Sequence, residues 1–508
     1  MGGEVAHVTP TRNIAVTESH LSDLILVLDE GTTSTRAIAF GLDGKVHATA
    51  QAELTQHYPK PGWVEHDARE IWDRTLSCAK DVAGEVGVER IASIGITNQR
   101  ETVVAWDRQT LEPLARAIVW QDRRTADFCE ELKAAGHEAE VQAKTGLLLD
   151  PYFSGTKMRW MIESVPAVGK AAQEGRLAFG TVESWVVAKL SGGTHVSDAS
   201  NASRTLLMPL DGEGFDAGLC ELLGVPHTAL PQVVDTQGAI AATQAALLGR
   251  SIPITGLLGD QQAATVGQGC FAPGEAKATF GTGAFILANA GTEPPSSDNR
   301  LLATVLMQED GKRTYAIEGS VFVAGSLVQW LRDSLKIIGT AAETEALARS
   351  VEDSGEVVIV PALAGLGAPH WRSEARGVIA GLSFASGRAQ IARAALEAMA
   401  HQAHDLAEAF AADGAEWTSL RIDGGMSAND WMAQDLADML GLPVERPDYV
   451  ETTALGAAIA ASVGAGLHPD LLAAAEAMRG GVTTFEPSMD RGVREARLSR
   501  WSKALAAA

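Results

Sequence analysis

The stretch LILVLDEGTTSTRAIAF, residues 24–40, decides the fold of this chain. Leu24–Leu28 is a short apolar run that ends in Asp29, a pattern typical of a buried strand. Gly31–Thr35 is a loop of small and hydroxyl-bearing residues, and Ala37–Phe40 predicts a second strand. The ordered chain therefore opens with a strand, a Gly/Thr loop and a returning strand.

The same unit returns in the second half of the chain. Ala276–Phe280 predicts a strand, Gly281–Gly283 a loop and Ala284–Ala288 the returning strand. A repeated unit of this kind indicates two similar domains, each with its own phosphate-sized loop. We expect the first domain to span residues 23–268 and the second to span residues 269–508.

Length and composition agree with a two-domain α/β protein. The chain has 508 residues, too many for one core, and it is 46% hydrophobic and 21% charged. Strands such as Ile91–Ile96, Ala117–Trp120 and Ile252–Leu258 alternate with helical stretches, which favours α/β domains with covered sheets. Residues 1–22 lack the apolar core of a signal peptide, so we expect a flexible tail there. No apolar run is long enough to predict a membrane span.

The charge balance excludes some partners. The chain has 41 Lys and Arg residues against 64 Asp and Glu residues, a net charge of −23. Binding to nucleic acid or to anionic lipid depends on a basic surface, so neither is expected. The cysteines form no CxxC pair and lie far apart, at Cys78, Cys129, Cys220 and Cys270. This usage favours the reducing cytoplasm.

The first Gly/Thr loop has the chemistry of a phosphate site. Gly31 lets the backbone approach a ligand closely. Asp29 can hold Mg²⁺, and Arg36 can pair with a phosphate. The hydroxyl groups that can donate to phosphate oxygens belong to Thr32, Thr33 and Ser34. A polar hairpin turn is the alternative interpretation of these residues.

Three further polar segments stay open at this point. Gly424 and Gly425 join a strand to a helix, and they can either cap the helix or leave backbone open to a base or a ribose. Asp260 begins a helix, where a carboxylate often caps the first turn. Arg100 and Glu101 lie in a loop between two strands. Neither a GxxxxGK[ST] motif nor a GxGxxG motif that opens a helix occurs, so any nucleotide is held by another device.

Longer strings make the chain resemble the FGGY carbohydrate-kinase family from about Leu24 to Trp501. The strings are DEGTTSTRA, YPKPGWVEHD, GITNQRET, TGLLLDPYFSGTK, SNASRT, GDQQAA, FGTG, QWLRD, GLGAP and ALGAA. The resemblance implies two actin-like, ribonuclease-H-like domains of the hexokinase type that flank a cleft. It also implies a cytoplasmic, ATP- and Mg²⁺-dependent transferase that moves the γ-phosphoryl group of ATP to a terminal hydroxyl of glycerol. The products would be sn-glycerol 3-phosphate and ADP, and the protein would be a dimer or a tetramer.

The same resemblance assigns roles to individual residues. Asp260 would be the general base. The polyol would contact Arg100, Glu101, Trp120, Tyr152, Asp260, Gln261 and Phe285. The phosphates would contact Thr32, Thr33, Ser34, Arg36 and Thr282. The nucleoside would contact Gly325, Gln329, Gly425 and Asn429, and Mg²⁺ would lie near Asp29.

Two departures from the family pattern keep other substrates open. Glu30 replaces a usual Gln and would add negative charge beside the phosphate loop, and Asp122 replaces a common Cys. These changes would suit an FGGY kinase for erythritol, xylulose or gluconate, although the bulky Trp120 and Phe285 close the expected pocket. A non-catalytic actin-like ATP switch is a remoter alternative, because it would share both phosphate loops but would need no polyol clamp.

Overall fold

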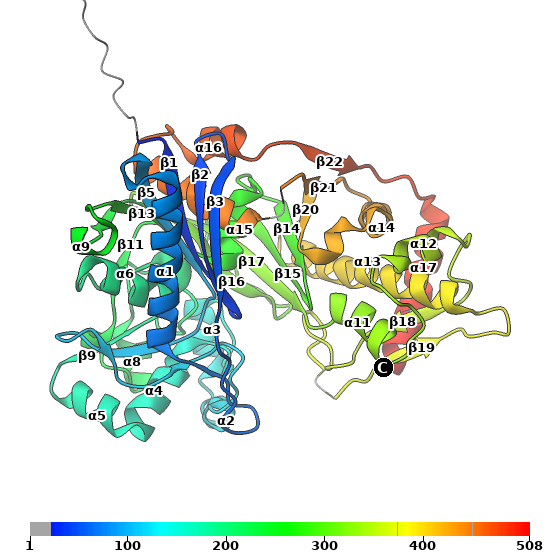
Figure 1. Ribbon diagram of the computed structural model, residues 1–508. Helices are drawn as coiled ribbons and strands as arrows, with labels where there is room; N and C mark the ends of the chain where they lie inside the picture. Colours follow the sequence, from blue (N-terminus) through cyan, green and yellow to red (C-terminus); the bar gives the residue numbers. More distant parts are fainter. Residues whose placement is uncertain (1–21, 373, 450) are drawn as a thin grey trace, which may run out of the picture.

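The computed structural model describes residues 22–372, 374–449 and 451–508, and it is built around two mixed sheets (Figure 1). The first sheet has the order β12-β13-β5-β1-β2-β3, and the second has the order β16-β17-β15-β14-β20-β21-β22. The strands of the first sheet are β1 (Leu24–Glu30), β2 (Ser34–Gly41), β3 (Val46–Glu53), β5 (Ile91–Asn98), β12 (Gln237–Ala242) and β13 (Pro253–Gly259). The strands of the second are β14 (Glu275–Phe280), β15 (Ala284–Gly291), β16 (Leu302–Glu309), β17 (Lys312–Val321), β20 (Ser419–Asp423), β21 (Val444–Pro447) and β22 (Val482–Phe485). Of the expected tail, only Ser22 lies within the described residues.

The repeated unit predicted from the sequence is confirmed. In the first sheet, β1 pairs antiparallel with β2 and parallel with β5. In the second, β14 pairs antiparallel with β15 and parallel with β20. Each sheet therefore has a central strand that forms an antiparallel hairpin with the next strand on one side and pairs with a parallel strand on the other.

Helices cover both faces of the first sheet, which explains its uninterrupted apolar strands. In β1, Leu24, Leu26 and Leu28 pack toward α1 (Ala68–Val86) and α6 (Val182–Ser191). The alternate residues Ile25 and Val27 pack toward α10 (Asp260–Gly267) and α15 (Thr452–Gly464). A strand that is buried on both faces loses the polar alternation of a half-exposed strand.

The chain returns to the first sheet late in the sequence, as the orange α15 beside the blue strands shows (Figure 1). Helices α10 and α15 cross so closely at Gly267 that a Cβ atom there would lie 2.0 Å from the carbonyl oxygen of Thr452. A Cβ atom on Gly456 would lie 1.8 Å from the carbonyl oxygen of Ala263. This crossing fixes α10, whose first residue is Asp260, against the first sheet.

A smaller unit, formed mostly by the chain between β5 and β12 and joined by β4 from before β5, packs around its own apolar core. Its helices and strands are β4 (Glu65–His66), β6 (Val104–Asp107), β7 (Glu112–Pro113), β8 (Ala117–Ile118), α2 (Ala126–Ala134), α3 (Glu138–Thr145), α4 (Ser154–Ser164), α5 (Pro166–Gln173), β9 (Leu177–Gly180), β10 (Val196–Asp198), α7 (Ala199–Ala202), α8 (Ala217–Leu222) and β11 (Gln232–Val234). The short helix α9 (Ala245–Leu248) precedes β13.

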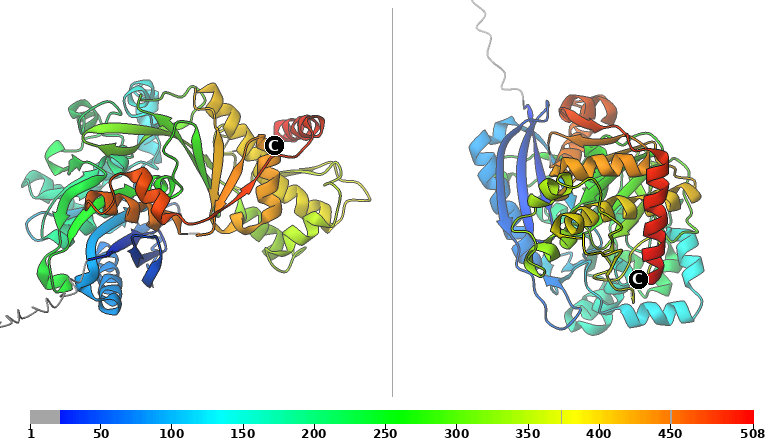
Figure 2. Two further views of the ribbon diagram at one scale, coloured as in Figure 1. Left: turned by 90° about the horizontal axis from the view of Figure 1, so that it is seen from above. Right: turned by 90° about the vertical axis from the view of Figure 1, so that its right-hand side faces the viewer.

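The remaining helices pack mainly on the outside of the second sheet (Figure 2). These helices are α11 (Gly325–Asp333), α12 (Glu343–Arg349), α13 (Arg388–Ala412), α14 (Asp430–Leu440) and α17 (Arg491–Ala507). Two short strands, β18 (Val358–Val360) and β19 (Val378–Ala380), lie in the same part of the chain. Helix α16 (Leu471–Met478) packs with α15 instead. Among the described residues, no helix is both long and apolar enough to span a bilayer.

One expected strand is much shorter than predicted. Residues 117–120 were expected to form a strand, but only Ala117 and Ile118 pair, as β8 against β4. The chain turns after Val119 because Asp122 accepts a hydrogen bond from the backbone nitrogen of Val64 at 2.6 Å. Trp120 therefore lies in a loop rather than in a strand.

Candidate active site

Three parallel strands of the first sheet end at one edge. Glu30 at the end of β1 pairs with Asn98 at the end of β5, which pairs with Gly259 at the end of β13. Ligands of open α/β sheets bind beyond the carboxyl ends of such strands. Asp29, Arg100 and Asp260 follow or precede these ends by one or two residues, so the register brings them together.

Four of the residues expected to contact a polyol lie together in the structure, namely Arg100, Glu101, Asp260 and Gln261, and we call them the polyol clamp after that expected role. Arg100 Nε lies 3.3 Å from Asp260 Oδ1 and 4.0 Å from Glu101 Oε1. The side chains of Arg100 and Glu101 are 2% and 1% exposed, whereas that of Asp260 is 32% exposed. Of these three charged groups, the carboxylate of Asp260 is therefore the most exposed.

Burial and neighbouring cations have opposite effects on the pKa of Asp260. Removal from water raises the pKa of this carboxyl, while Arg100 and Lys277 lower it, and the net shift is upward. The same residue accepts a hydrogen bond from the backbone nitrogen of Gln261 at 2.7 Å. Asp260 thus has a strengthened basicity for a carboxylate together with partners that fix its position.

Lys277 belongs to this site although no sequence pattern singled it out. It is fully buried on β14, and its Nζ contacts Gln261 Oε1 and lies 3.0 Å from Thr279 Oγ1. Burial lowers its pKa, and Asp423 and Asp260 oppose that shift. The lysine therefore links the second sheet to the clamp on the first.

Aromatic rings form a wall beside the clamp. Trp120 and Tyr152 meet edge to face with ring centroids 5.7 Å apart. The indole Nε1 of Trp120 donates to Thr32 Oγ1 at 3.0 Å, so this wall touches the first Gly/Thr loop. Phe285 lies across from Thr279 in the β14–β15 ladder, and cross-strand partners point to the same face. Phe285 therefore faces the side on which Thr279 meets Lys277.

Arg36, on β2 just after the first Gly/Thr loop, is paired with two carboxylates. Arg36 Nη2 lies 2.5 Å from Asp29 Oδ2, and Arg36 Nη1 contacts Glu451 at the start of α15. Burial raises the pKa of the Asp29 carboxyl, while Arg36 lowers it. Thr33 is exposed, and Thr32 and Ser34 are partly exposed, which leaves this loop accessible.

Glu30 does not behave as the sequence led us to expect. Its carboxylate was expected beside the phosphate loop, but the side chain points the other way, toward α1, and is fully buried. Thr35 and Thr75 donate to its Oε1 at 2.9 and 2.8 Å. Burial raises the pKa of Glu30 to about 8, so near neutral pH this carboxyl is largely protonated. Successive residues of a strand face opposite sides, so Asp29 faces the loop and Glu30 faces the core.

Asp122 is also explained by its surroundings. Its fully buried carboxylate lies 2.7 Å from Arg124 Nη2 and accepts from the backbone nitrogen of Val64. The guanidinium of Arg124 lies over the rings of Trp63 and Trp160, at 3.8 and 4.6 Å from their centroids. Asp122 therefore fixes a buried cation between two indoles and does not line the polyol clamp.

The four residues expected around a nucleoside come from two regions that the second sheet brings together. Gly325 begins α11, and a Cβ atom there would lie 3.2 Å from Cγ of Met426. Space is open at Gly425, where a Cβ atom would meet nothing within 4 Å. Asn429 caps α14 through the backbone nitrogen of Met432, and Gln329 is exposed on α11. The loop with Thr282 adjoins them, since the backbone nitrogen of Gly325 donates to Gly281.

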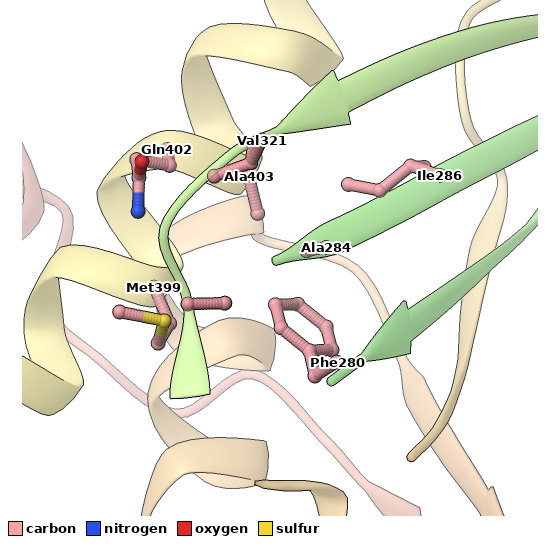
Figure 3. A pocket seen from close by; sticks show the side chains of 8 residues that line it. Phe280, Ala284, Ile286, Val321, Met399, Gln402 and Ala403 are labelled. Atoms are coloured by element: carbon pink, nitrogen blue, oxygen red, sulfur yellow. The ribbon is translucent and has the colours of Figure 1, made fainter. Parts of the chain in front are cut away.

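A small apolar pocket lies behind this loop, between β14, β15 and α13 (Figure 3). Figure 3 shows Phe280, Ile286 and Met399 around it, with the amide of Gln402 turned aside. Nε2 of Gln402 donates to the carbonyl oxygen of Val323 at 3.2 Å. No charged side chain lines the pocket, so it suits packing support for the loop better than a phosphate or polyol site.

Family models match most of the chain. The N-terminal domain of the FGGY family of carbohydrate kinases matches residues 24–267, and the C-terminal domain matches residues 276–465. The chain belongs to the FGGY family of carbohydrate kinases. This FGGY kinase keeps the two-domain α/β fold that the resemblance implied.

Individual relatives give finer comparisons. A glycerol kinase from Rhodospirillum centenum is 51% identical over 484 residues, which are 95% of this chain and 97% of that protein. The structure of a Plasmodium falciparum glycerol kinase with ADP superposes with a TM-score of 0.91 at 34% identity, covering 95% of this chain and 97% of that one. A xylulose kinase from Rhodospirillum rubrum gives 0.84 at 27% identity, with coverage of 95% and 98%. Of these two solved structures, the glycerol kinase is the more similar in both fold and sequence.

Two more buried charges of this FGGY kinase were missed from the sequence. Glu318 on β17 contacts Arg100, and Arg204 after α7 contacts Glu101. A signal did exist for Glu318, because this charge directly follows the apolar residues Tyr315–Ile317 in a strand that is buried over most of its length. Only the pairing of the two halves shows where that charge points.

Proposed function

We propose that this FGGY kinase transfers the γ-phosphoryl group of ATP to a terminal hydroxyl of glycerol. The products are sn-glycerol 3-phosphate and ADP. Relatives that are about half identical over nearly the whole chain and are named glycerol kinases support this substrate. Every residue that the resemblance assigned to the polyol is present.

The observation that carries the proposal is the exposure of Asp260 within a buried charge cluster. The side chain of Asp260 is 32% exposed, and Arg100 Nε lies 3.3 Å from its Oδ1. A substrate hydroxyl that donates to Asp260 loses its proton there as the phosphoryl group is transferred. Because the transition state for phosphoryl transfer is loose, a well-placed carboxylate of modest basicity is sufficient.

The clamp and the aromatic wall suit the two sides of a small polyol. Glu101 and Gln261 provide oxygen atoms for hydroxyl groups, and Arg100 provides N–H donors. Trp120 and Tyr152, which meet edge to face, provide an apolar surface for the carbon chain. A site built around substrate hydroxyls rejects analogues that lack them by about 10⁴–10⁵-fold.

The nucleotide would lie between the two Gly/Thr loops. Thr32, Thr33, Ser34 and Arg36 face it from the first sheet and Thr282 from the second, while Gly325, Gln329, Gly425 and Asn429 hold the nucleoside. The open backbone at Gly425 leaves room for the base or the ribose.

Asp29 fits a magnesium ion that travels with ATP. Mg²⁺ in such sites takes one or two carboxylates and completes its shell with phosphate oxygens and water. Among the described residues, no cluster of three or more His, Cys, Asp or Glu side chains forms a metal cage. When bound, the ion neutralises charge on the transferring phosphoryl group. Arg36 holds the Asp29 carboxylate in place beside this loop, with Nη2 at 2.5 Å from Oδ2.

The cellular compartment, the oligomeric state and the domain bounds are proposed from the same family resemblance. We expect the protein to act in the cytoplasm as a dimer or a tetramer, with residues 23–268 and 269–508 as its two domains, the second of which also contributes α15 and α16 to the packing of the first sheet. Four free, buried cysteines support a reducing compartment. Light scattering of the purified chain would measure its oligomeric state directly.

A coupled assay of ADP release tests the proposal. MgATP is offered with glycerol, erythritol, xylulose or gluconate at matched concentrations. Saturable turnover is expected with glycerol, with a kcat/KM well above the other three values. Turnover on a longer polyol alone would contradict the glycerol assignment and would leave the nucleotide site unaffected.

A further inference from the structure

Four buried charges join the two sheets, and two of them, Arg100 and Glu101, belong to the polyol clamp. Glu318 on β17 accepts from Arg100 Nη1 at 2.6 Å and from Arg100 Nη2 at 3.2 Å. Its Oε1 also accepts from Arg204 Nη2 at 3.2 Å. Arg204 Nε donates in turn to Glu101 Oε1 at 2.6 Å. We call Arg100, Glu101, Arg204 and Glu318 the four-charge cluster.

The cluster holds Glu101 in an unusual backbone conformation. The φ angle of Glu101 is 61°, in the left-handed region that residues with a Cβ atom rarely adopt. Arg204 grips its side chain, and Ser154 donates to its carbonyl oxygen at 3.1 Å. Backbone in this region is held where the surrounding structure over-determines it, and such positions gather at functional sites.

The arrangement is costlier than stability alone requires. All four side chains are at most 3% exposed, and apolar residues of similar size would often stabilise such a position as well or better. Nη1 of Arg204 is buried without a hydrogen-bond partner among the described residues. Burial alone would raise the pKa of Glu318, but Arg100 and Arg204 outweigh burial and lower it to about 2. The carboxylate is therefore ionised at every pH at which the enzyme would work.

We infer that Glu318, from the second sheet, is a positioning residue for polyol recognition. It grips Arg100 with both oxygens and holds Arg204, which in turn holds Glu101. The two polyol-contacting charges of the first sheet are thereby fixed in one geometry relative to Asp260. This inference deepens the proposed function and rests on it, since it concerns the same site.

The nucleotide groups lie outside this mechanism. None of the bonds within the four-charge cluster involves Thr32, Thr282 or Gly425. Loss of the Glu318 charge should therefore weaken polyol binding selectively, and the KM for ATP should stay near its wild-type value. A residue that served stability alone would change both KM values together or neither.

The test is steady-state kinetics of Glu318→Gln against the polyol with the highest wild-type kcat/KM. We expect the polyol KM to rise about 10–100-fold, as for a lost charged hydrogen bond of about 1.5–3 kcal/mol, with the KM for ATP within about 2-fold. Glu309→Gln, an exposed carboxylate on the adjoining strand β16, is the matched control and should leave both values unchanged. An unchanged polyol KM in Glu318→Gln would overturn the inference, as would equal rises in both KM values.

A double variant tests whether any effect of Glu318→Gln comes only from a loss of stability. Glu318→Gln combined with Arg204→Met removes one charge of each sign. We expect the double variant to recover the melting temperature while its polyol KM stays high. Recovery of both would assign Glu318 to stability alone. Wild-type enzyme that turns over another polyol but not glycerol contradicts the proposed substrate, and the polyol KM of the variants still tests the positioning role.

Discussion

The indole Nε1 of Trp120 lies 3.0 Å from the hydroxyl oxygen of Thr32, so the aromatic wall beside the proposed polyol site is hydrogen-bonded to the first Gly/Thr loop. Trp120 follows β8 in the smaller unit, and Thr32 follows β1 in the first sheet. Trp120 therefore serves both proposed substrates, glycerol through its apolar ring and ATP through its hydrogen bond to Thr32. Substitutions at Trp120 should separate these two contributions.

Trp120→Phe keeps an aromatic ring against Tyr152 and loses the hydrogen bond to Thr32. A net loss of about 1 kcal/mol at the loop corresponds to about a 5-fold rise in the KM for ATP. The KM for glycerol should change less, because the apolar face remains. Trp120→Leu removes the ring and should raise the KM for glycerol more than Trp120→Phe does. The opposite order of effects in initial-rate assays would reject this division.

Asp260→Asn replaces the proposed base by an amide of the same shape. We expect kcat to fall about 10²–10⁴-fold, because a general base contributes about that factor. The melting temperature and the affinity for ADP should stay near the wild-type values, since Asp260 touches the clamp and not the nucleoside residues. Near-normal turnover of the folded variant would remove Asp260 from the mechanism.

Lys277→Met should change how activity depends on pH. Burial raises the pKa of Asp260, and Arg100 and Lys277 hold it down. Without the lysine the pKa of Asp260 rises further, so the acidic limb of the kcat/KM profile should move to higher pH. Lys189→Met removes a lysine from α6, outside the site, and should leave that limb in place. A profile of Lys277→Met that matches the wild type would show that the cation does not act on Asp260.

Glu30→Gln should stabilise the protein in a particular pH range. The pKa of Glu30 is about 8 in the fold against an ordinary 4.5, so between these values the folded state binds a proton that the unfolded state has lost. The wild-type contribution of Glu30 is therefore most favourable below pH 4.5 and declines as the pH rises toward 8. The gain in melting temperature of Glu30→Gln should grow from pH 5 to pH 8.

The control for this prediction is Glu53→Gln, an exposed carboxylate on β3. Its melting temperature should follow the wild type at each pH. A gain for Glu30→Gln that is the same at pH 5 and pH 8 would mean that Glu30 is ionised in the fold.

Asp122→Ala separates stability from substrate choice. The change leaves Arg124 buried between Trp63 and Trp160 with one carboxylate fewer. Loss of one partner from a buried ion pair costs about 3 kcal/mol, which urea denaturation would measure. The ranking of polyols by kcat/KM should not change, because Asp122 does not line the clamp. A changed ranking would restore Asp122 as a specificity residue, and the exposed Asp127→Ala is the control for the loss of a charge on this surface.

Local patterns were sufficient for the central strands and for the two Gly/Thr loops that follow them. Leu24–Leu28 and Ala276–Phe280 are uninterrupted apolar runs, and the structure places both as central strands. The shorter β8 was not foreseen, since the turn after Val119 depends on a bond between Val64 and Asp122, which lie far apart in the sequence. The quoted strings gave the family, because long runs of matching residues are specific where a single glycine loop is not.

The sequence by itself determined the two-domain α/β fold, the family and the residue types of the polyol clamp. Only the tertiary structure decided the direction of Glu30, the partner of Asp122 and the place of Lys277, Arg204 and Glu318 in the site. The physical reason is that these roles depend on sheet register and on how the two sheets meet. A buried charge acts on whatever lies within a few ångströms of it, and Glu318 and Arg100, 218 positions apart in sequence, meet only in the folded chain.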